Sequence, residues 1–215
     1  MKQLDKLLDR ITVNAHSSVR IEAAGKTLYV DPFSLKTAPR DADLIFLTHE
    51  HFDHFSPEDI ARVGREDTRF VLPESIAEKT APVTAGRPVI AVRPGQAGEA
   101  AGIPFEAVRA YNPHKRFHPR ERDWVGYVLT VDGLRIYTAG DSDLTPEAEA
   151  VRCDLALLPI GGTYTMNAAE AAALANRLRP LAVIPIHYGS VAGSPADFET
   201  FAAGVDPGIR VVKKV

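Results

Sequence analysis

The sequence is poor in cysteine and has no long apolar run. Cys153 is the single cysteine among 215 residues, which excludes a disulfide framework and a thiolate zinc cluster. No apolar stretch approaches the roughly 20 residues of a membrane span, and the first residues lack the apolar segment of a secretion signal. The formal net charge of −3 provides no basic surface for sequence-independent nucleic-acid binding. We therefore expect a cytoplasmic globular protein whose partner is a small-molecule substrate, with no nucleic acid or membrane as a partner and with a homo-oligomer left open.

Apolar periodicity predicts strands and helices in alternation. A hairpin at 19–30 and a continuous apolar strand at 44–47 lie in the first half, and a hairpin at 125–138 lies in the second. Each half then continues with alternating strands and helices, and no linker separates them. This order predicts one α/β domain over residues 1–215, with mixed sheets that each carry helices on one outer face. The other predicted elements are helices at 2–9, from Ser56 to Gly64, from Ser75, from Thr145, at 168–178 and from Ser194, strands near 69–72, 88–92, 103–110, 155–158, 181–186 and 209–212, and a loop at 112–123.

Three of the seven histidines lie within six residues, directly after the strand at 44–47. The motif reads His49-x-His51-x-Asp53-His54, and imidazole and carboxylate groups are suitable ligands for zinc and similar ions. His49 and His51 alternate and can converge on one ion, whereas Asp53 and His54 point differently and can serve a second. A loop of solvent-exposed histidines is the alternative. The clustering of so few histidines behind a buried strand favours a metal site.

Several motifs follow predicted strands in a fixed order. They are Asp31, Thr-His-Glu-His-Phe-Asp-His at 48–54, Ala-Gly-Asp at 139–141 and Pro-Ile-His-Tyr-Gly at 185–189. In this order the sequence resembles the metallo-β-lactamase fold superfamily of metal-dependent hydrolases. Phe-His-Pro at 117–119, Trp-Val-Gly-Tyr at 124–127 and Ile-Gly-Gly-Thr-Tyr-Thr-Met at 160–166 are similar to the branch that contains L-ascorbate-6-phosphate lactonase. The resemblance implies a four-layer αββα sandwich of two mixed β-sheets flanked by helices, with a two-metal site at one edge of the sheets.

The resemblance also implies which side chains hold the metals. The first metal would be held by His49 and His51, the second by Asp53, His54 and His187, and both by a bridging Asp141. Asp31 is either a hydrogen-bond partner that orients a ligand histidine or part of an Asp-Pro turn. We interpret Asp143 as part of the turn that starts the helix at Thr145.

One first-metal histidine departs from the superfamily pattern. It usually follows a strand directly, where this chain has Ala110-Tyr111-Asn112. His114 and His118 are the candidates, and we expect His118, because Phe117 can anchor the loop and Pro119 restrains the backbone before it. His16 lies among Asn and Ser in a predicted turn and is interpreted as structural. Cys153 is interpreted as a small packed residue.

Two divalent ions, zinc by expectation and otherwise manganese, iron or nickel, would make hydroxide available at neutral pH. Asp53 would position this dimetal-bound nucleophile and relay its proton. Lys115 and Arg116 could bind a phosphate or carboxylate, or form a solvated basic loop, and Tyr164 could line the pocket or simply pack.

The predicted function is the hydrolysis of a small ester-like substrate, such as a lactone or a phosphorylated sugar-acid derivative. A phosphodiesterase or RNA-processing nuclease uses the same chemistry and is the alternative, although the net charge of −3 weighs against it. A redox or binding protein is a third class. Diiron members of the superfamily favour Glu at the position of His51, so this histidine favours hydrolysis.

Overall fold

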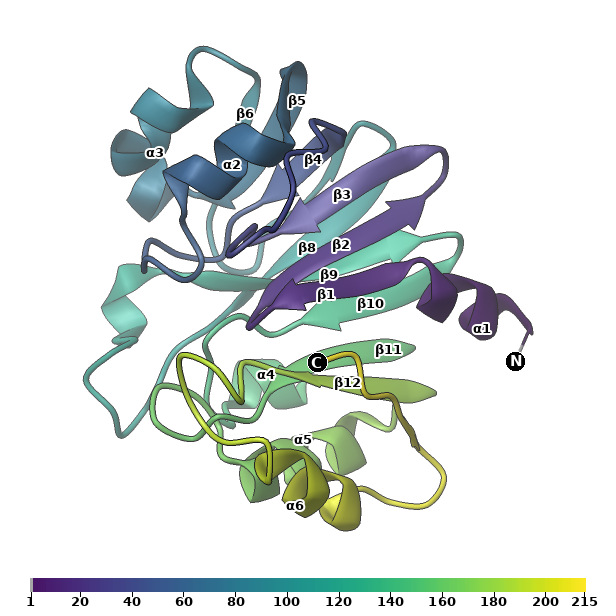
Figure 1. Ribbon diagram of the computed structural model, residues 1–215. Coiled ribbons are helices and arrows are strands. Elements are labelled where there is room, and N and C mark those ends of the chain that lie inside the picture. Colours follow the sequence, from purple (N-terminus) through teal and green to yellow (C-terminus); the bar gives the residue numbers. More distant parts are fainter. Residues whose placement is uncertain (1) are drawn as a thin grey trace.

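Two mixed β-sheets pack face to face in the computed structural model, which describes residues 2–215 (Figure 1). The strands of the first sheet are β1 (Ile11–Ala15), β2 (Ser18–Ala23), β3 (Lys26–Val30), β4 (Ala42–Phe46), β5 (Gly64–Pro73) and β6 (Val89–Val92), in that order across the sheet. β1, β2 and β3 are antiparallel neighbours, and β3 to β6 are parallel neighbours.

The second sheet repeats this arrangement in reverse. Its strands are β7 (Ala97–Ala100), β8 (Ile103–Arg109), β9 (Val125–Val131), β10 (Leu134–Thr138), β11 (Leu155–Pro159), β12 (Ala182–Ile186) and β13 (Arg210–Val211). They lie in the order β13-β12-β11-β10-β9-β8-β7. β7 to β10 are antiparallel neighbours, and β10 to β13 are parallel neighbours. Every residue of β11 and β12 is buried, as expected for parallel strands covered on both faces.

Helices cover the outer face of each sheet and complete the four layers, and one further helix lies at an end of the sandwich (Figure 1). They are α1 (Lys2–Asp9), α2 (Pro57–Val63), α3 (Ala77–Thr84), α4 (Pro146–Glu149), α5 (Ala168–Leu178) and α6 (Asp197–Gly204), with short 3-10 turns at Glu74–Ile76 and Arg120–Arg122. α2 and α3 pack on the first sheet, and α4, α5 and α6 pack on the second. None of the helices within residues 2–215 is long and apolar enough to cross a membrane.

The core between the sheets holds the sandwich together. Phe46 of β4 meets Tyr127 of β9 with ring centroids 5.2 Å apart. Leu4, Leu7 and Leu8 of α1 join the same apolar cluster, so this helix closes one end of the core. β1 starts beside α1 and runs to the opposite end of the sandwich, where the candidate ligands gather.

Most of the predicted elements are confirmed, and the fold class is the predicted αββα sandwich. The helices 2–9 and 168–178 have the predicted bounds, and the second carries the predicted capping box of Asn167 and Glu170. Cys153 packs against the apolar cluster under the second sheet, as expected.

Two predicted helix starts are wrong. Ser75 lies inside a 3-10 turn, and α3 begins two residues later without a side-chain cap. Ser194 does not cap α6. Its backbone N–H donates to Asp197 Oδ2 over 2.6 Å, and α6 begins at Asp197 without a side-chain cap. β1 and β7 were not predicted because polar, glycine and exposed residues interrupt their alternation.

Candidate metal centre

Side chains that follow strands of both sheets meet at one edge of the sandwich. The chain leaves its strands toward this edge at His16 after β1, Asp31 after β3, His49 after β4, Asp141 after β10 and His187 after β12. The backbone N–H of His187 donates to the His16 carbonyl over 3.0 Å and so joins the two sheets here.

Three of these residues have left-handed backbone conformations, with φ of 54° at His16, 46° at Asp31 and 58° at His187. Such strain persists where the surrounding structure imposes it, and it clusters at functional sites.

A first group of ligand atoms comes from His49, His51 and His118. His118 is buried, and its Nε2 lies 3.2 Å from His49 Nε2. His118 Nδ1 donates to Asn112 Oδ1 over 2.9 Å, which fixes the ring in the loop after β8. Trp124 packs against all three imidazoles, with ring centroids 4.9 to 5.3 Å away. The structure therefore brings the expected His118 to the centre, whereas His114 is exposed.

A second group comes from His16, Asp53, His54 and His187. Asp53 Oδ2 lies 3.2 Å from His16 Nε2, 3.6 Å from His187 Nε2 and 3.7 Å from His54 Nε2. The rings of His16 and His187 are 3.6 Å apart.

His16 lies in the predicted turn, but its position among the predicted ligands of the second metal was not expected. Its ring is buried and its Nε2 faces the predicted ligands of the second metal. The sequence feature that could have identified His16 is its position directly after a strand, because Asp31 and His187 were identified by the same position. Because β1 was not predicted, the position of His16 at the end of a strand was not recognised.

Asp141 lies between the two groups. Its Oδ1 is 3.0 Å from His54 Nε2, and its Oδ2 is 3.2 Å from His187 Nε2. The same Oδ2 is 3.4 Å from His118 Nε2 and 4.0 Å from His49 Nε2. One carboxylate thus faces nitrogen atoms of both groups.

Asp31 orients the centre rather than forming only a turn. It accepts hydrogen bonds from the Thr48 backbone over 2.8 Å, from the Thr48 hydroxyl over 2.6 Å and from His54 Nδ1 over 2.7 Å. The Thr48 hydroxyl in turn accepts from His49 Nδ1 over 2.9 Å. These bonds leave the Nε2 atoms of His49 and His54 directed to the centre, the usual arrangement around metal-binding histidines.

Several buried polar atoms of the centre form no hydrogen bond of regular geometry within residues 2–215, although most of them have polar neighbours. They are His16 Nε2, His54 Nε2, Asp141 Oδ1 and both ring nitrogens of His187. Buried polar groups are nearly always satisfied, because leaving one unpaired costs roughly 1–3 kcal/mol. Six imidazoles and two carboxylates converge here. This donor set fits divalent ions that accept nitrogen and oxygen, and it exceeds the four ligands of one tetrahedral zinc.

Burial and charge set the protonation of these groups. Burial lowers the pKa of His118 to about 4 and the pKa of His49 well below its usual value, so both rings are neutral at pH 7. Burial opposes a proton on His54, but Asp141 and Asp31 outweigh it and raise the pKa of this histidine. The negative charge of Asp141 and Asp31, which favours a proton on His54, would also favour a metal cation beside it.

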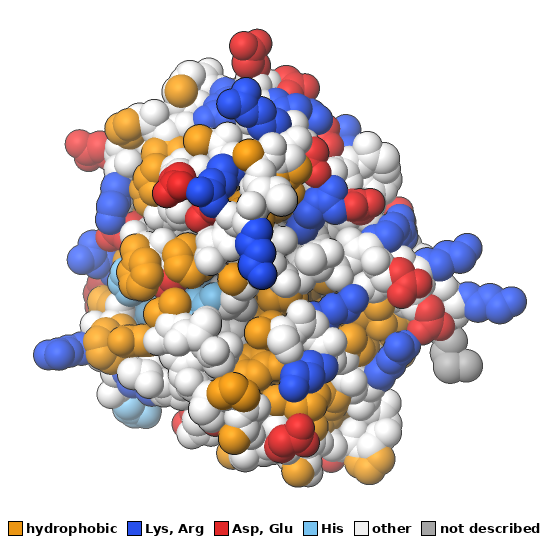
Figure 2. Space-filling model, in the orientation of Figure 1, with side chains coloured by type: hydrophobic (Ala, Val, Ile, Leu, Met, Phe, Trp, Pro, Cys, Tyr) orange, Lys and Arg blue, Asp and Glu red, His pale blue; other side chains and the backbone are white. Residues whose placement is uncertain are grey.

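A cavity of about 290 Å³ opens beside the centre. Its lining residues are His51, Phe52, Asp53, Phe117, Asp141, Tyr164 and Val191. At the left of Figure 2, histidine atoms are visible in a hollow between hydrophobic side chains. Tyr164 lines this cavity, which is one of the two positions expected for it.

The two predicted anion-binding cations do not line the cavity. Lys115 Nζ donates to Asp143 Oδ1 over 2.5 Å and to the Thr165 carbonyl over 2.7 Å. Asp143 therefore ties the 112–123 loop to the segment between β10 and α4, and the cap of α4 is Thr145. Arg116 is exposed and stacks over the Phe117 ring, with its guanidinium 5.7 Å from the ring centroid.

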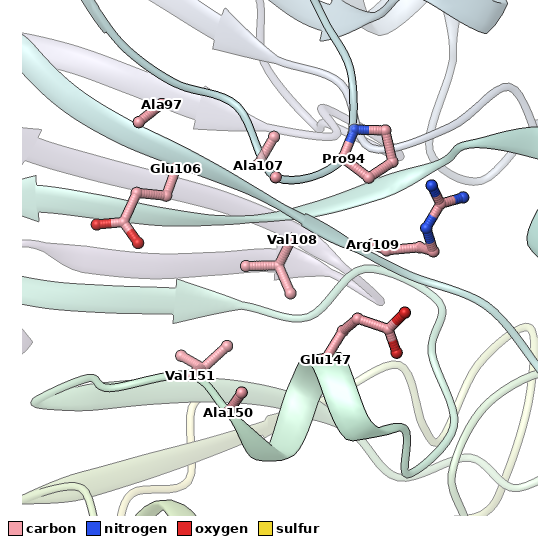
Figure 3. A pocket seen from close by; sticks show the side chains of 10 residues that line it. Pro94, Ala97, Glu106, Ala107, Val108, Arg109, Glu147, Ala150 and Val151 are labelled. Carbon is pink, nitrogen blue, oxygen red and sulfur yellow. The ribbon is translucent and has the colours of Figure 1, made fainter.

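A larger cavity of about 470 Å³ lies away from the histidines, between β8 and α4 (Figure 3). The charged groups around it already have partners. Glu106 pairs with Arg135, and Glu147 pairs with Arg120. This cavity offers no free group for chemistry among its lining residues.

Comparisons with known proteins find relatives over most of the chain. A sequence model described as a beta-lactamase superfamily domain matches residues 10–187, a range that contains every candidate ligand. A UPF0173 metal-dependent hydrolase of Geobacillus sp. (strain WCH70) is 32% identical, with 95% of this chain and 96% of the relative covered. A UPF0173 metal-dependent hydrolase of Thermococcus onnurineus (strain NA1) is also 32% identical, with 86% and 88% covered.

Solved structures are similar as well. A candidate metal-dependent hydrolase from Parabacteroides distasonis ATCC 8503 superposes with a TM-score of 0.82 at 34% identity, covering 94% of this chain and 91% of that one. The metallo hydrolase Igni18 from Ignicoccus hospitalis KIN4/I has a TM-score of 0.73 at 26% identity, with 95% and 94% covered.

Proposed function

The chain belongs to the UPF0173 metal-dependent hydrolases of the metallo-β-lactamase superfamily, and we propose that it cleaves a small ester-like substrate with the help of two divalent ions. The first ion would be held by His49, His51 and His118. The second would be held by Asp53, His54 and His187, with His16 as an additional nitrogen donor. Zinc suits this set of imidazoles and carboxylates, and manganese, iron or nickel would fit the same donors.

The observation that carries the proposal is the position of Asp141. Its two oxygens lie 3.0 to 3.4 Å from ring nitrogens of His54, His187 and His118, which belong to different ligand groups. A carboxylate placed in this way can bind both ions at once. Its second role is electrostatic, because it offsets part of the positive charge that two cations would bring into a buried site.

When bound, the two ions would supply Lewis acidity and lower the pKa of a water molecule toward ~7. Asp53 lines the cavity and is ionised at neutral pH, because its neighbours His16 and His187 outweigh burial and hold its pKa below the usual range. As a carboxylate it would orient the attacking water and take its proton. Asp53 would then pass this proton to the leaving oxygen.

Tyr164 would contact the substrate from the cavity wall. Lys115 would hold the 112–123 loop through Asp143 rather than contact the substrate. Arg116 would remain at the rim. Within the ester-like class, a lactone and a phosphorylated sugar-acid derivative are both to be tested. A phosphodiester substrate is the competing hypothesis, since phosphodiester hydrolysis uses the same ions.

Metal analysis combined with a substrate panel tests the proposal. We expect metal-depleted protein to take up two equivalents of Zn²⁺ or Mn²⁺ and then to hydrolyse lactones or esters. The panel also contains thioesters, β-lactams and a phosphodiester such as bis(p-nitrophenyl) phosphate. Binding of a single equivalent would contradict the two-ion centre. Turnover of the phosphodiester alone would establish the competing function.

A further inference from the structure

We propose that the substrate carries an apolar group beside its scissile bond, and that the aromatic wall of the cavity binds this group. The wall consists of Phe52, Phe117, Tyr164 and Val191. The inference rests on the proposed hydrolysis and specifies the substrate class of the same site.

The wall stands directly next to the catalytic groups. The cavity that it borders also contacts His51, Asp53 and Asp141. A substrate whose reactive carbonyl reaches these residues must therefore place its neighbouring atoms against the wall. The Phe117 and Tyr164 rings meet edge to face with centroids 4.7 Å apart, which forms a preorganised apolar surface.

Two wall residues are apolar and exposed. Phe52 is 67% exposed and Val191 is 39% exposed, and neither belongs to the apolar clusters of the described chain. A single exposed apolar residue is ordinary. Two of them at the mouth of one cavity, next to two further aromatic rings, indicate a surface for an apolar ligand.

Two cations of the 112–123 loop are paired with carboxylates. Lys115 binds Asp143, and Arg122 forms an ion pair with Glu50 over 3.4 Å. The Arg116 guanidinium lies 5.7 Å from the Phe117 ring centroid, and no Lys or Arg of residues 2–215 lines the cavity. A phosphate or carboxylate on the substrate tail would lose its hydration without gaining a cationic partner, which is unfavourable.

The cavity is also small. Its volume of about 290 Å³ lies at the lower end of the roughly 300–1,000 Å³ that small-molecule sites occupy. A short alkyl or aryl substituent fits this space, whereas a substrate with a bulky polar tail must extend past the rim.

The test compares γ-lactones that carry alkyl chains of zero, two and four carbons with a γ-lactone that carries a phosphomonoester on a four-carbon chain. With the metal-loaded protein we expect kcat/KM to rise about two- to fourfold for each added methylene, since each buried methylene favours binding by this order. We expect the phosphorylated lactone to be the poorest of the longer substrates. A flat series, or a preference for the phosphorylated lactone that Arg116→Ala abolishes, would overturn the inference.

Matched variants assign the preference to the wall. Val191→Ser and Phe52→Ala should each flatten the chain-length dependence, because they should lower kcat/KM for the lactone with a four-carbon chain several-fold more than for the unsubstituted lactone. Val89→Ser and Leu181→Ser are the controls. Val89 is 40% exposed and Leu181 is 52% exposed, and neither lines the cavity, so both controls should keep the full dependence.

Equilibrium binding separates this inference from the proposed function. Calorimetric titration of the metal-loaded protein with acetate, butyrate and hexanoate needs no turnover, and affinity should rise with chain length. If no lactone or ester is hydrolysed but affinity rises in this way, the proposed function fails and the apolar site stands. If lactones are hydrolysed and affinity is independent of chain length, the apolar site is wrong.

Discussion

His118 Nε2 lies 3.2 Å from His49 Nε2, although the two residues are 69 positions apart in the chain. Each ring donates its Nδ1–H to a neighbour, His118 to Asn112 and His49 to Thr48. Both Nε2 atoms therefore carry lone pairs that face each other in a buried site. A cation bound by both nitrogens would relieve the repulsion between these lone pairs.

The contact between His118 and His49 predicts the effect of removing the His118 imidazole. His118→Ala should weaken binding of the first ion by about 100-fold or more, since even loss of a supporting hydrogen bond costs roughly 10–100-fold. His114→Ala should leave metal affinity unchanged, because His114 is exposed. Calorimetric titration of both variants with Zn²⁺ gives the comparison. Equal affinity in the two variants would show that His49 and His51 hold the first ion without this loop.

The second prediction concerns the carboxylate between the ligand groups. Asp141→Asn should lower kcat/KM by about 100-fold, or about 2.7 kcal/mol, because a neutral amide replaces a charged bridge. The fold should survive, as judged by far-UV circular dichroism. Asp143→Asn is the matched control, since Asp143 contacts Lys115 rather than the histidines. If Asp141→Asn keeps near-native turnover, the bridging role is wrong.

The third prediction tests His16 as a ligand of the second ion. His16→Asn removes the imidazole and keeps a residue that tolerates the left-handed backbone at this position. The affinity for the second ion should fall about 10–100-fold, whereas the first ion should bind as before. Ser190→Ala, which removes the hydroxyl 3.2 Å from His16 Nδ1, should have a smaller effect.

A lower melting temperature with unchanged affinity for both ions would give His16→Asn a purely structural explanation. The two results are distinguishable because affinity is measured on the folded protein by titration, and stability is measured separately by thermal unfolding.

The sequence predicts best those features that lie next to each other in the chain. His49, His51, Asp53 and His54 share one loop after a strongly apolar strand, so local pattern was sufficient to find them. His187 was found for the same reason. The αββα architecture was predicted from the resemblance to the metallo-β-lactamase fold superfamily. Its hairpins and capped helices were predicted from turn and cap residues.

Features that depend on distant partners were not predictable in this way. Lys115 is held by Asp143 and Thr165, which lie 28 and 50 residues further along the chain. No local pattern could show that this lysine is neutralised. His16 was missed because β1 has five residues and contains the polar Asn14, so its strand character depends on pairing with β2.

The last prediction uses the close approach of Gly161 to His187. A β-carbon at position 161 would lie 2.3 Å from the His187 carbonyl oxygen and 3.2 Å from Ala192 Cβ. Gly161→Ala must therefore displace the backbone that carries His187. We expect a loss of about 1–3 kcal/mol in the free energy of unfolding, or roughly 2–10 °C in Tm.

The displacement should also lower the affinity for the second ion and leave the affinity for the first unchanged, because His187 faces Asp53 and not His51. Gly208→Ala is the control, since a β-carbon at position 208 meets no atom within 4 Å. Thermal unfolding and stepwise titration with Zn²⁺ measure the two effects on the same samples. If Gly161→Ala lowers Tm but both ions bind with native affinity, the place of His187 in the second site is wrong, because a ligand moved by its own backbone cannot keep its geometry at the metal.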